Sequence, residues 1–587
     1  MIRHITSLVA LLAMALCLCA CAQTGKQAGP KTAEQWQAEH VLPAYAPNRE
    51  ITGKYEASLA AKCVNGTFVG QRKGDVRVWK GIPFAQQPVG ALRFREPQPA
   101  PASDRVFEAY HFMKSAMQPI DPPELASTYE QGEDCLGLNI WTNARATKMA
   151  KPVLVFIHGG GWLTSGTSDP LYDGHIFAEN NPDVLVVTID YRLGMLGQIN
   201  LSSFPDGKDY PNSEMLGILD QVQALKWIKE NIAAFGGDPN NVTISGESAG
   251  GGAVSTLCLL PQAKGLFSKA IPMSGSVAQL NQKSETANQV AALRKEFGCQ
   301  TVAELQKIPF DKLRKWWGIN CASVYHHPTR GNALIEADPF KQWARGDTAG
   351  LTIMQGHTAN EFRYFIMVYC NMETVYDAVC EGTAKALLQN GGKKYARAYA
   401  AYEKALRGLG HDAKDIYHAF MDDHIFNSSQ LYQAEMHAKN GGKGFFYTFE
   451  KGYDGEYANL GAAHAVDCFY LLGNFDGKSV FGTPEEVQLS RRFQRMVANF
   501  CKTGDPSADG LTWPEYNGTT RYRMMIGEKM RVAKNPEKAR VDAVMKMMDA
   551  GDALRFMGNE STWLKNGEAI NPKAVEECRE TWRSLQK

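Results

Sequence analysis

The stretch Asn241–Gly252 constrains the fold more strongly than any other part of this 587-residue chain. It opens with the β-branched and apolar run Val242–Ile244, turns at Gly246-Glu247-Ser248-Ala249-Gly250, and continues into small residues. Gly-x-Ser-x-Gly between a strand and a helix is the pattern of a nucleophile elbow, whose serine sits on a strained turn at a helix N-terminus. A side chain at either glycine would collide with a neighbouring element. The same five-residue pattern also occurs in ordinary turns, so the assignment of Ser248 as nucleophile depends on partners elsewhere.

The first residues of the chain predict export. The apolar run Leu8–Leu16 is too short to span a bilayer, and it follows a positively charged start. It ends in Leu18-Cys19-Ala20-Cys21, which resembles a bacterial lipoprotein signal with Cys21 as the lipidated residue. Because Ala20-Cys21-Ala22 also fits an ordinary small-residue cleavage site, removal of Cys21 is the alternative. No later segment is apolar and long enough to cross a membrane.

Composition along the chain predicts four segments. Residues 1–21 form the signal, 22–61 a polar tether with prolines, 62–531 the main folded domain, and 532–587 a helical extension packed on that domain. With 44% apolar residues, the chain can bury a large core. Its net charge of +1 shows no imbalance that would favour nucleic acid or an acidic membrane surface.

Alternating strands and helices predict a doubly wound α/β sheet, mostly parallel, with helical insertions covering the active site. The runs Pro152–Ile157 and Asp183–Tyr191 are apolar on both faces, as in central strands of a covered parallel sheet. Leu216–Phe235 then carries an apolar stripe at helical spacing. Further strands are expected at 270–275, 351–356 and 444–449, the last as the final main strand, with helical insertions at about 284–343 and 372–439.

The segment His158-Gly159-Gly160-Gly161 follows the first of these central strands. Glycines there let backbone N–H groups approach a reacting oxygen without a Cβ in the way. We expect the N–H groups of Gly160, Gly161 and Ala249 to form an oxyanion hole, and Trp162 to contact the substrate. A flexible glycine turn without function is the alternative.

A serine nucleophile of this type needs an acid and then a histidine, in that order along the chain. His464 lies in a small-residue loop after the 444–449 strand, from which its ring can reach the serine. Glu361 follows the 351–356 strand and is predicted to orient that ring. Asp338 is a rival without a comparable strand before it, and Asp467 is better suited to ordering the histidine loop. Glu247 is expected to be structural, hydrogen-bonded beneath the elbow. The other histidines after Ser248 lie mostly in the insertions.

Together these motifs resemble the type-B carboxylesterases, a family that includes bacterial esterases, cholinesterases and bile-salt lipases. The likeness covers about residues 63 to 530. It implies an α/β-hydrolase fold, a catalytic triad of Ser248, Glu361 and His464, and no cofactor or metal. Further matching stretches are Lys80–Ala85, Glu133–Leu136, Asp190–Gly194, Asp220-Gln221, Phe235–Pro239, Asn360-Glu361 and Phe500–Pro506.

The chain departs from the family at its cysteines. The family often pairs the cysteine of Glu-Asp-Cys-Leu with one upstream, but the expected stretch here reads Ser115-Ala116-Met117-Gln118. Cys135 therefore lacks its usual partner, and both a bond to Cys63 and a free buried thiol stay open. Cys299 also lacks a near partner, with Cys321 the nearest candidate. Phe362 replaces the glycine that often follows the family's acid, and this substitution narrows the range of conformations open to the local backbone.

The sequence thus predicts a serine carboxylic ester hydrolase that acts through an acyl-enzyme on a small or medium-sized ester. A lipase, lactonase or peptidase would use the same triad with another pocket. A cholinesterase-like adhesion protein usually lacks triad residues, all of which are present here. The expected partner is the ester alone, without nucleic acid, and with a membrane only through the lipid anchor in the periplasm or at the outer membrane.

Overall fold

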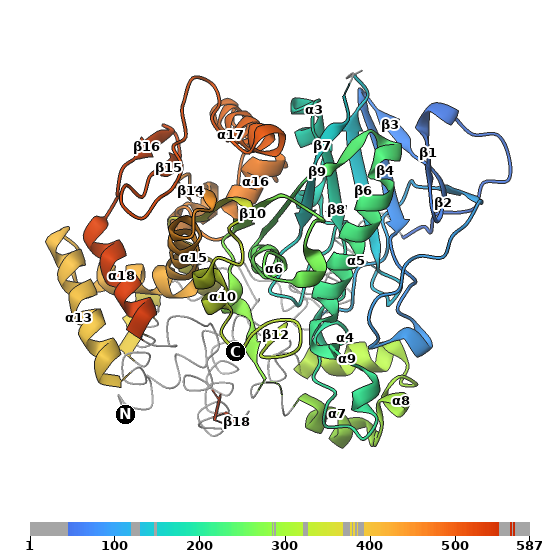
Figure 1. Cartoon of the computed structure of the whole chain (residues 1–587), viewed down its shortest axis with the longest axis horizontal. Coiled ribbons are helices and arrows are strands. Elements are labelled where there is room, and N and C mark those ends of the chain that lie inside the picture. Colours follow the sequence, from blue (N-terminus) through green and yellow to red (C-terminus); the bar gives the residue numbers. More distant parts are fainter. Residues whose placement is uncertain are drawn as a thin grey trace, which may run out of the picture.

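The computed structural model describes residues 45–118, 130–145, 149–283, 286, 289–320, 327–367, 376–377, 380–381, 384–385, 392–550, 564–565 and 568–569. An eleven-stranded sheet runs through the molecule, in the spatial order β16-β15-β14-β13-β10-β9-β7-β8-β6-β4-β3 (Figure 1). Its strands are β3 (Gln71–Lys73), β4 (Val76–Pro83), β6 (Gly137–Asn143), β7 (Lys151–Ile157), β8 (Leu185–Ile189), β9 (Gly237–Glu247), β10 (Lys269–Met273), β13 (Thr352–Thr358), β14 (Lys443–Phe449), β15 (Arg523–Ile526) and β16 (Arg531–Ala533).

The seven strands from β15 to β8 in this order are parallel to one another, and the strands beyond them at both edges pair antiparallel. A smaller sheet of β1 (Ala60–Cys63), β2 (Gly66–Val69) and β5 (Val106–Glu108) precedes β6 in the chain. The predicted α/β class, with its mostly parallel doubly wound sheet, is confirmed.

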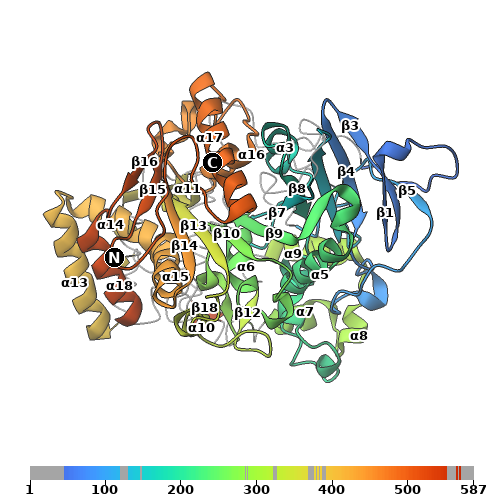
Figure 2. The same cartoon turned by 45° about the horizontal axis from the view of Figure 1, so that its top comes forward.

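Helices cover both faces of the sheet, which explains why its central strands are apolar throughout. On one side lie α3 (His175–Asn180), α16 (Val466–Leu472) and α17 (Pro484–Thr503); on the other lie α5 (Leu216–Asn231), α6 (Ala249–Leu257) and α15 (Ser428–Lys439) (Figures 1 and 2). In β7, Val153 and Val155 pack in the core cluster with α5 and α6, whereas Leu154 and Phe156 pack with α17. The alternation follows from the two-residue period of a strand.

Two groups of helices are inserted between the later strands, as the sequence predicts. The first contains α7 (Gln289–Phe297), α8 (Val302–Leu305), α9 (Phe310–Asn320) and α10 (Pro339–Arg345). The second contains α13 (Gly392–Gly408), α14 (Ala413–Asp422), the π-helical turn η10 (Asp423–Asn427) and α15. Near the C-terminus, α18 (Lys538–Ala550) lies beside α13 (Figure 1).

The structure corrects three details of the sequence analysis. The strand at 444–449 is not the final main strand, because β15 and β16 extend the sheet beyond it. The folded part begins before residue 62, since β1 starts at Ala60 and the Asn48 amide donates to the carbonyl of Lys80 at 2.8 Å. At the other end, β16 crosses the predicted boundary after residue 531, so the start of the C-terminal extension belongs to the sheet.

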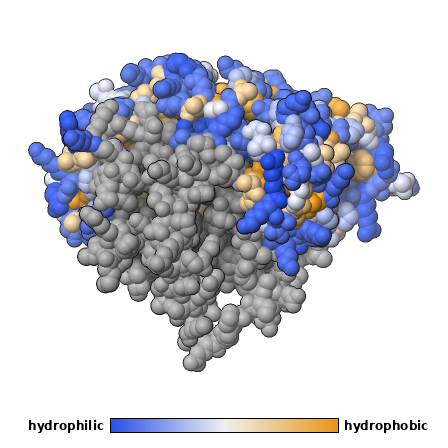
Figure 3. Space-filling view, turned by 90° about the horizontal axis from the view of Figure 1, so that it is seen from below, coloured by the Kyte–Doolittle hydropathy of each residue, from blue (hydrophilic) through white to orange (hydrophobic). Residues whose placement is uncertain are grey.

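No helix in the described part of the chain has the length and apolar character needed to span a membrane. Seen from below, the described surface is mostly hydrophilic, with apolar side chains scattered in small groups (Figure 3). The predicted signal and its Cys21 lie outside the described residues.

One very close approach between elements in this core occurs where α6 meets the end of β7. A Cβ built on Gly250 would lie 2.1 Å from the carbonyl oxygen of Ile157 and 2.8 Å from that of His158. A Cβ on Gly246 would lie 2.6 Å from the carbonyl carbon of Gly250. Backbone atoms cannot yield as a flexible side chain does, so only glycine fits at these positions.

We therefore expect Gly250→Ala to lower the free energy of unfolding by about 3 kcal/mol, the upper part of the range for overpacked cores. The control is Gly350→Ala, because a Cβ at exposed Gly350 meets no atom within 4 Å. The control should change stability by less than about 0.5 kcal/mol. Thermal and urea unfolding measure both; equal stability of the two variants would contradict the close approach.

Candidate active site

The parallel strands bring the predicted site residues to one edge of the sheet. In the register, Ile157 of β7 lies opposite Gly246 of β9, and Met273 of β10 lies opposite both Glu247 and Gly356. These strands therefore end at the same level, and the segments that follow them meet there. Those segments carry the glycine loop after β7, Ser248 after β9, Glu361 after β13 and His464 after β14.

Ser248 sits on the turn between β9 and α6 with φ 57° and ψ −123°. A positive φ is strained for a residue with a side chain, at a cost of about 1–3 kcal/mol. The surroundings impose it: the Ser248 N–H donates to the Met273 carbonyl at 3.0 Å, and its own carbonyl accepts from Gly252 at 2.9 Å. Ser248 keeps 8% of its surface exposed at the N-terminus of α6.

Glu361 is the first residue of α11 (Glu361–Met367) and is fully buried. One of its oxygens, Oε1, accepts from the Ser274 hydroxyl at 2.6 Å and from the Thr358 N–H at 2.8 Å. The other, Oε2, lies 2.6 Å from Nδ1 of His464. Every contact of the carboxylate thus comes from a donor, which is the arrangement that stabilises its ionised form.

His464 lies in the loop between η11 (Gly455–Leu460) and α16, and its ring is almost completely buried. The Tyr453 hydroxyl donates to the His464 carbonyl at 2.9 Å. Phe426 stacks flat on the imidazole, with ring centroids 4.6 Å apart and planes 2° apart, and Phe365 covers it at 4.9 Å. Because Nδ1 faces a carboxylate that only accepts, Nδ1 carries the proton of the neutral imidazole, and the lone pair of that neutral ring lies on Nε2.

The Nε2 atom of His464 makes no hydrogen bond within the described part of the chain, and it lies 3.2 Å from Oε1 of Glu247. Glu247 precedes Ser248, so the free nitrogen faces the elbow. The bond expected for Glu247 beneath the elbow is not made by Oε1, which has no hydrogen-bond partner among the described residues. Its carboxyl group instead belongs to the surroundings of His464.

The pKa values of this buried cluster reflect one imidazole among three carboxyl groups. Burial alone would lower the pKa of His464, but the charges of Glu247 and Glu361 and the Glu361 hydrogen bond raise it to about 9. Burial raises the pKa of Glu247 to about 8 against the opposing charge of His464. Burial would also raise the pKa of Glu361, yet the His464 charge and the hydrogen bonds lower it overall. The carboxyl group of Glu361 is thus the one held in its ionised form, whereas the pKa values of Glu247 and His464 are both raised.

Asp467, which the sequence assigns to loop ordering, accepts from the Tyr447 hydroxyl at 2.8 Å. Burial raises its pKa to about 7. Asp338, the rival acid, occupies the N-cap position of α10 and lies 3.9 Å from the Lys341 ammonium. His464 thus donates its hydrogen bond to Glu361 and not to Asp338.

The glycine loop after β7 has its carbonyl groups fixed. Nδ1 of His158 donates to the Gly159 carbonyl at 3.0 Å, because a carbonyl can only accept. The Gly160 carbonyl accepts from Leu163 and Thr164 N–H groups at 3.0 and 2.9 Å. In a trans peptide the N–H points in the direction opposite to the carbonyl of the preceding residue. The N–H groups of Gly160 and Gly161 therefore point away from the fixed carbonyls of Gly159 and Gly160.

This loop lies directly against the elbow. A Cβ on Gly159 would approach the Ser248 Cβ to 3.1 Å, and one on Gly160 would reach the Thr164 carbonyl oxygen at 2.3 Å. Gly160 and Gly161 have φ of 92° and 61°, which glycine adopts freely. A Cβ on Gly161 would meet nothing within 4 Å, so this part of the loop borders open space. Ala249, the third predicted donor, begins α6.

Trp162 is completely buried at the end of this loop. Its ring lies edge-on to Tyr191 at 6.1 Å and is 6.4 Å from the ring of His327. Tyr191 stacks on His158 at 4.4 Å and donates its hydroxyl to the His158 carbonyl at 2.7 Å. The glycine loop is thus supported by three buried rings that contact one another, those of Trp162, Tyr191 and His158.

Sequence reasoning missed Ser274 as a member of the site. It follows β10 with φ 43°, and its hydroxyl donates to Glu361. The signal was available, because a serine after a parallel strand next to the elbow strand must lie at the same edge of the sheet. His327, placed with the insertions, was also missed; it is buried and hydrogen-bonded to the Gln279 carbonyl at 2.9 Å. No local pattern distinguishes it from the other histidines.

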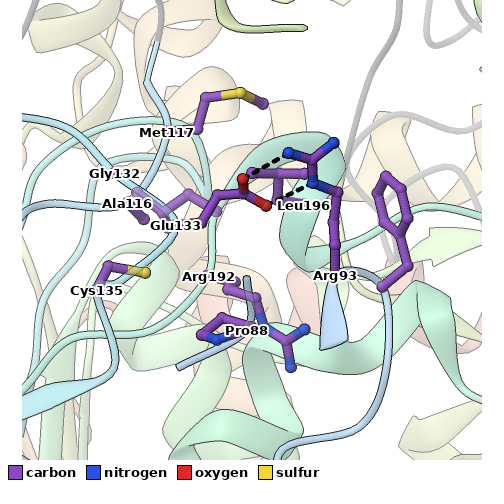
Figure 4. A pocket seen from close by; sticks show the side chains of 11 residues that line it. Pro88, Arg93, Ala116, Met117, Gly132, Glu133, Cys135, Arg192 and Leu196 are labelled. Atoms are coloured by element: carbon purple, nitrogen blue, oxygen red, sulfur yellow. Dashed lines mark hydrogen bonds and ion pairs between the residues drawn. The ribbon is translucent and has the colours of Figure 1, made fainter. Parts of the chain in front are cut away.

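A small cavity, whose lining includes Cys135 but none of the predicted triad or oxyanion-hole residues, is a separate feature (Figure 4). Arg93 and Glu133 face each other across it in a two-bond ion pair with both distances 2.5 Å. Ala116 and Met117 line the same cavity as Cys135, in the stretch where the family often has a cysteine. Cys135 is a free buried thiol, and so are Cys63 and Cys299; Cys321 lies outside the described residues. Burial keeps the pKa of Cys135 well above its usual range, so the thiol is unreactive.

Comparison with known proteins shows to which family the chain belongs. The sequence model of the carboxylesterase family matches residues 57–544. The chain belongs to the carboxylesterase family. It is 32% identical to the para-nitrobenzyl esterase of Bacillus subtilis over 491 residues, covering 80% of this chain and 95% of that protein. It is also 32% identical to the liver carboxylesterase of Sus scrofa over 512 residues, covering 78% and 86%.

Solved carboxylesterase structures share the fold. A PNB esterase superposes with a TM-score of 0.73 at 31% identity, covering 83% of this chain and 99% of that chain. A carboxylesterase of Geobacillus stearothermophilus gives a TM-score of 0.73 at 30% identity, with the same coverage. The predicted family, α/β-hydrolase fold and serine ester hydrolase class are confirmed. Like its relatives, this carboxylesterase-family chain is a carboxylic ester hydrolase. Among the described residues no group of three or more His, Cys, Asp or Glu side chains is arranged so that it could hold a metal ion.

The effect of Glu247 on the pKa of His464 can be tested. Because the Glu247 charge raises the pKa of His464, Glu247→Gln should move the acidic limb of the kcat/KM profile to lower pH by about 1 unit. Asp467→Asn is the control, since Asp467 is the smallest contributor to the His464 shift and should move the limb less. An unchanged limb in Glu247→Gln, or a shift to higher pH, would show that Glu247 does not act on the base.

Proposed function

We propose that Ser248, His464 and Glu361 form the catalytic triad of this hydrolase and that Gly160, Gly161 and Ala249 supply the oxyanion hole. The observation that carries the proposal is the buried 2.6 Å hydrogen bond from His464 Nδ1 to Glu361, which leaves Nε2 facing the elbow. A nucleophile, a base and a group that orients the base are the parts of an acyl-transfer site.

The reaction proceeds in two halves. The Ser248 hydroxyl attacks the ester carbonyl carbon while His464 Nε2 takes its proton, and the carbonyl oxygen becomes an oxyanion bound by the N–H groups. The imidazolium gives the proton to the leaving alcohol, and the acyl group stays on Ser248 as an ester. Water then attacks the acyl-enzyme by the same steps, releasing the acid. Glu361 stays ionised and stabilises the imidazolium, because Ser274 and Thr358 donate to its other oxygen.

Aromatic side chains around the imidazole support a preference for esters with apolar or aromatic groups. Phe426, Phe365 and Tyr364 lie within 4.6, 4.9 and 6.0 Å of the His464 ring, measured between centroids. The two helical insertions shape the pocket on the other sides, and the buried Trp162 supports the glycine loop. The name of the Bacillus subtilis relative makes a nitrobenzyl ester the first substrate to test, beside short acyl esters.

Ser248→Ala should lower the turnover of p-nitrophenyl butyrate by at least about 10⁴-fold, because no other group can form the acyl-enzyme. Wild type should release a burst of p-nitrophenol on mixing and be labelled by a fluorophosphonate. The control Ser58→Ala alters an exposed serine that contacts Glu56 and should behave as wild type. If Ser248→Ala retains activity, the nucleophile lies elsewhere. A panel with a triglyceride, a lactone and a peptide separates the lipase, lactonase and peptidase alternatives.

The signal-like residues 1–21 support export and attachment of lipid to Cys21, in the periplasm or at the outer membrane. More than one acyl chain would hold the mature enzyme at a membrane surface stably. Intact mass of the exported wild type should show acyl chains on an N-terminal Cys21, and Cys21→Ser should lose them. An unmodified mature chain that begins after Cys21 would favour the ordinary cleavage site and contradict the proposed lipid anchor.

A further inference from the structure

The long helix formed by α14, η10 and α15 contains a π-helical turn beside the candidate triad. This turn spans Asp423–Asn427, with ordinary helix on both sides. A π turn inserts an extra residue into the helical repeat and thereby turns neighbouring side chains to new directions. Adjacent residues of this turn contact different parts of the protein.

One side of the turn faces the triad. Phe426 lies flat on His464, with the two ring planes 2° apart. Asp422, four residues earlier and thus on the same face of the helix, accepts from the Phe362 N–H at 2.8 Å. Phe362 is the residue after Glu361 in the first turn of α11. The turn contacts the imidazole, and Asp422, the residue directly before the turn, contacts the backbone that carries the carboxylate partner of that imidazole.

The other side of the turn is held by the C-terminal helix. Arg540 of α18 donates from Nε and from a terminal nitrogen to the two oxygens of Asp423, both at 2.9 Å. Tyr402 of α13 adds its hydroxyl at 2.7 Å. Asp423 is 2% exposed and Tyr402 is completely buried, so the two-bond ion pair is shielded from water. A planar guanidinium paired in this way fixes both position and orientation of the carboxylate.

We propose that Arg540 is a positioning residue for catalysis: its ion pair with Asp423 fixes the π turn, which keeps Phe426 flat on His464 and Asp422 bound beside Glu361. The inference rests on the triad proposed above. Small displacements of a base or its partner cost rate out of proportion to their size, because proton transfer needs close alignment. The helix α18 is thereby part of the catalytic unit, although none of its described residues contacts the triad.

A second anchor of the same helix provides the matched control. Arg521 donates to Asp542 of α18 at 2.5 Å and to Glu435 of α15 at 3.1 Å. Arg521→Met thus loosens α18 as Arg540→Met does and also releases Glu435 of α15, but it does not remove the ion pair between Asp423 and Arg540. A merely structural role of Arg540 would make the two variants alike.

The test measures kcat and KM for p-nitrophenyl butyrate, the pH profile of kcat and the melting temperature in the full chain. Arg540→Met should lower kcat about 10-fold to 100-fold with KM within about twofold, and should shift the acidic limb of the profile. Arg540→Lys, which keeps the charge but not the paired geometry, should restore part of kcat. Arg521→Met should keep kcat within about twofold and leave the limb unchanged, at a comparable loss in melting temperature. A wild-type kcat and pH limb in folded Arg540→Met, or equal kcat losses in both variants, would overturn the proposal.

If the lone Asp423 charge prevents Arg540→Met from folding, the double variant Asp423→Asn with Arg540→Met removes both buried charges. It should show the same loss of kcat, and wild-type kcat in it would overturn the proposal equally. Ser248→Ala separates this inference from the proposed function. An active Ser248→Ala refutes the triad itself, whereas an inactive Ser248→Ala with a fully active double variant refutes only the role of Arg540.

Discussion

The site depends above all on the buried hydrogen bond between Glu361 and His464, 2.6 Å long. A carboxylate without exposure to water would be unstable without charged or polar partners, and Glu361 has three donors and no exposed surface. The bond selects one tautomer of the imidazole and leaves Nε2 toward the elbow. Ser274, Thr358 and the strained Ser248 turn are placed by strand ends that stand at the same level of the parallel sheet.

Around this bond the protein combines charge with apolar cover. Glu247 and Asp467 bring further carboxyl groups close to the imidazole, and burial raises the pKa of each, to about 8 and about 7. The flat ring of Phe426 excludes water from one face of His464. Low polarity around a protonatable ring strengthens every nearby charge, so small changes in the surrounding helices affect the base. The ion pair of Arg540 with Asp423 connects this sensitivity to the C-terminal helix.

The sheet and the elbow could be predicted because their signals are local. Apolar runs such as Pro152–Ile157 predict buried parallel strands, and the close approach at Gly250 requires glycine. Glu361 and His464 could be named because each follows a strand whose end must reach the same edge. The contacts of Glu247, His327 and Arg540 could not be predicted, because each depends on side-chain packing between segments far apart in the chain. The strands β15 and β16 were missed because strands of three or four residues carry little periodicity.

The most direct test of the account is a crystal structure of the enzyme after reaction with a small phosphonate ester. We predict phosphorus bonded to Ser248 Oγ, with the phosphoryl oxygen about 2.7–3.1 Å from the N–H groups of Gly160, Gly161 and Ala249. His464 Nε2 should lie within hydrogen-bonding distance of the Ser248 oxygen while Nδ1 keeps its bond to Glu361. Phosphorus on another residue, or a phosphoryl oxygen pointing away from the glycine loop, would contradict the proposed site.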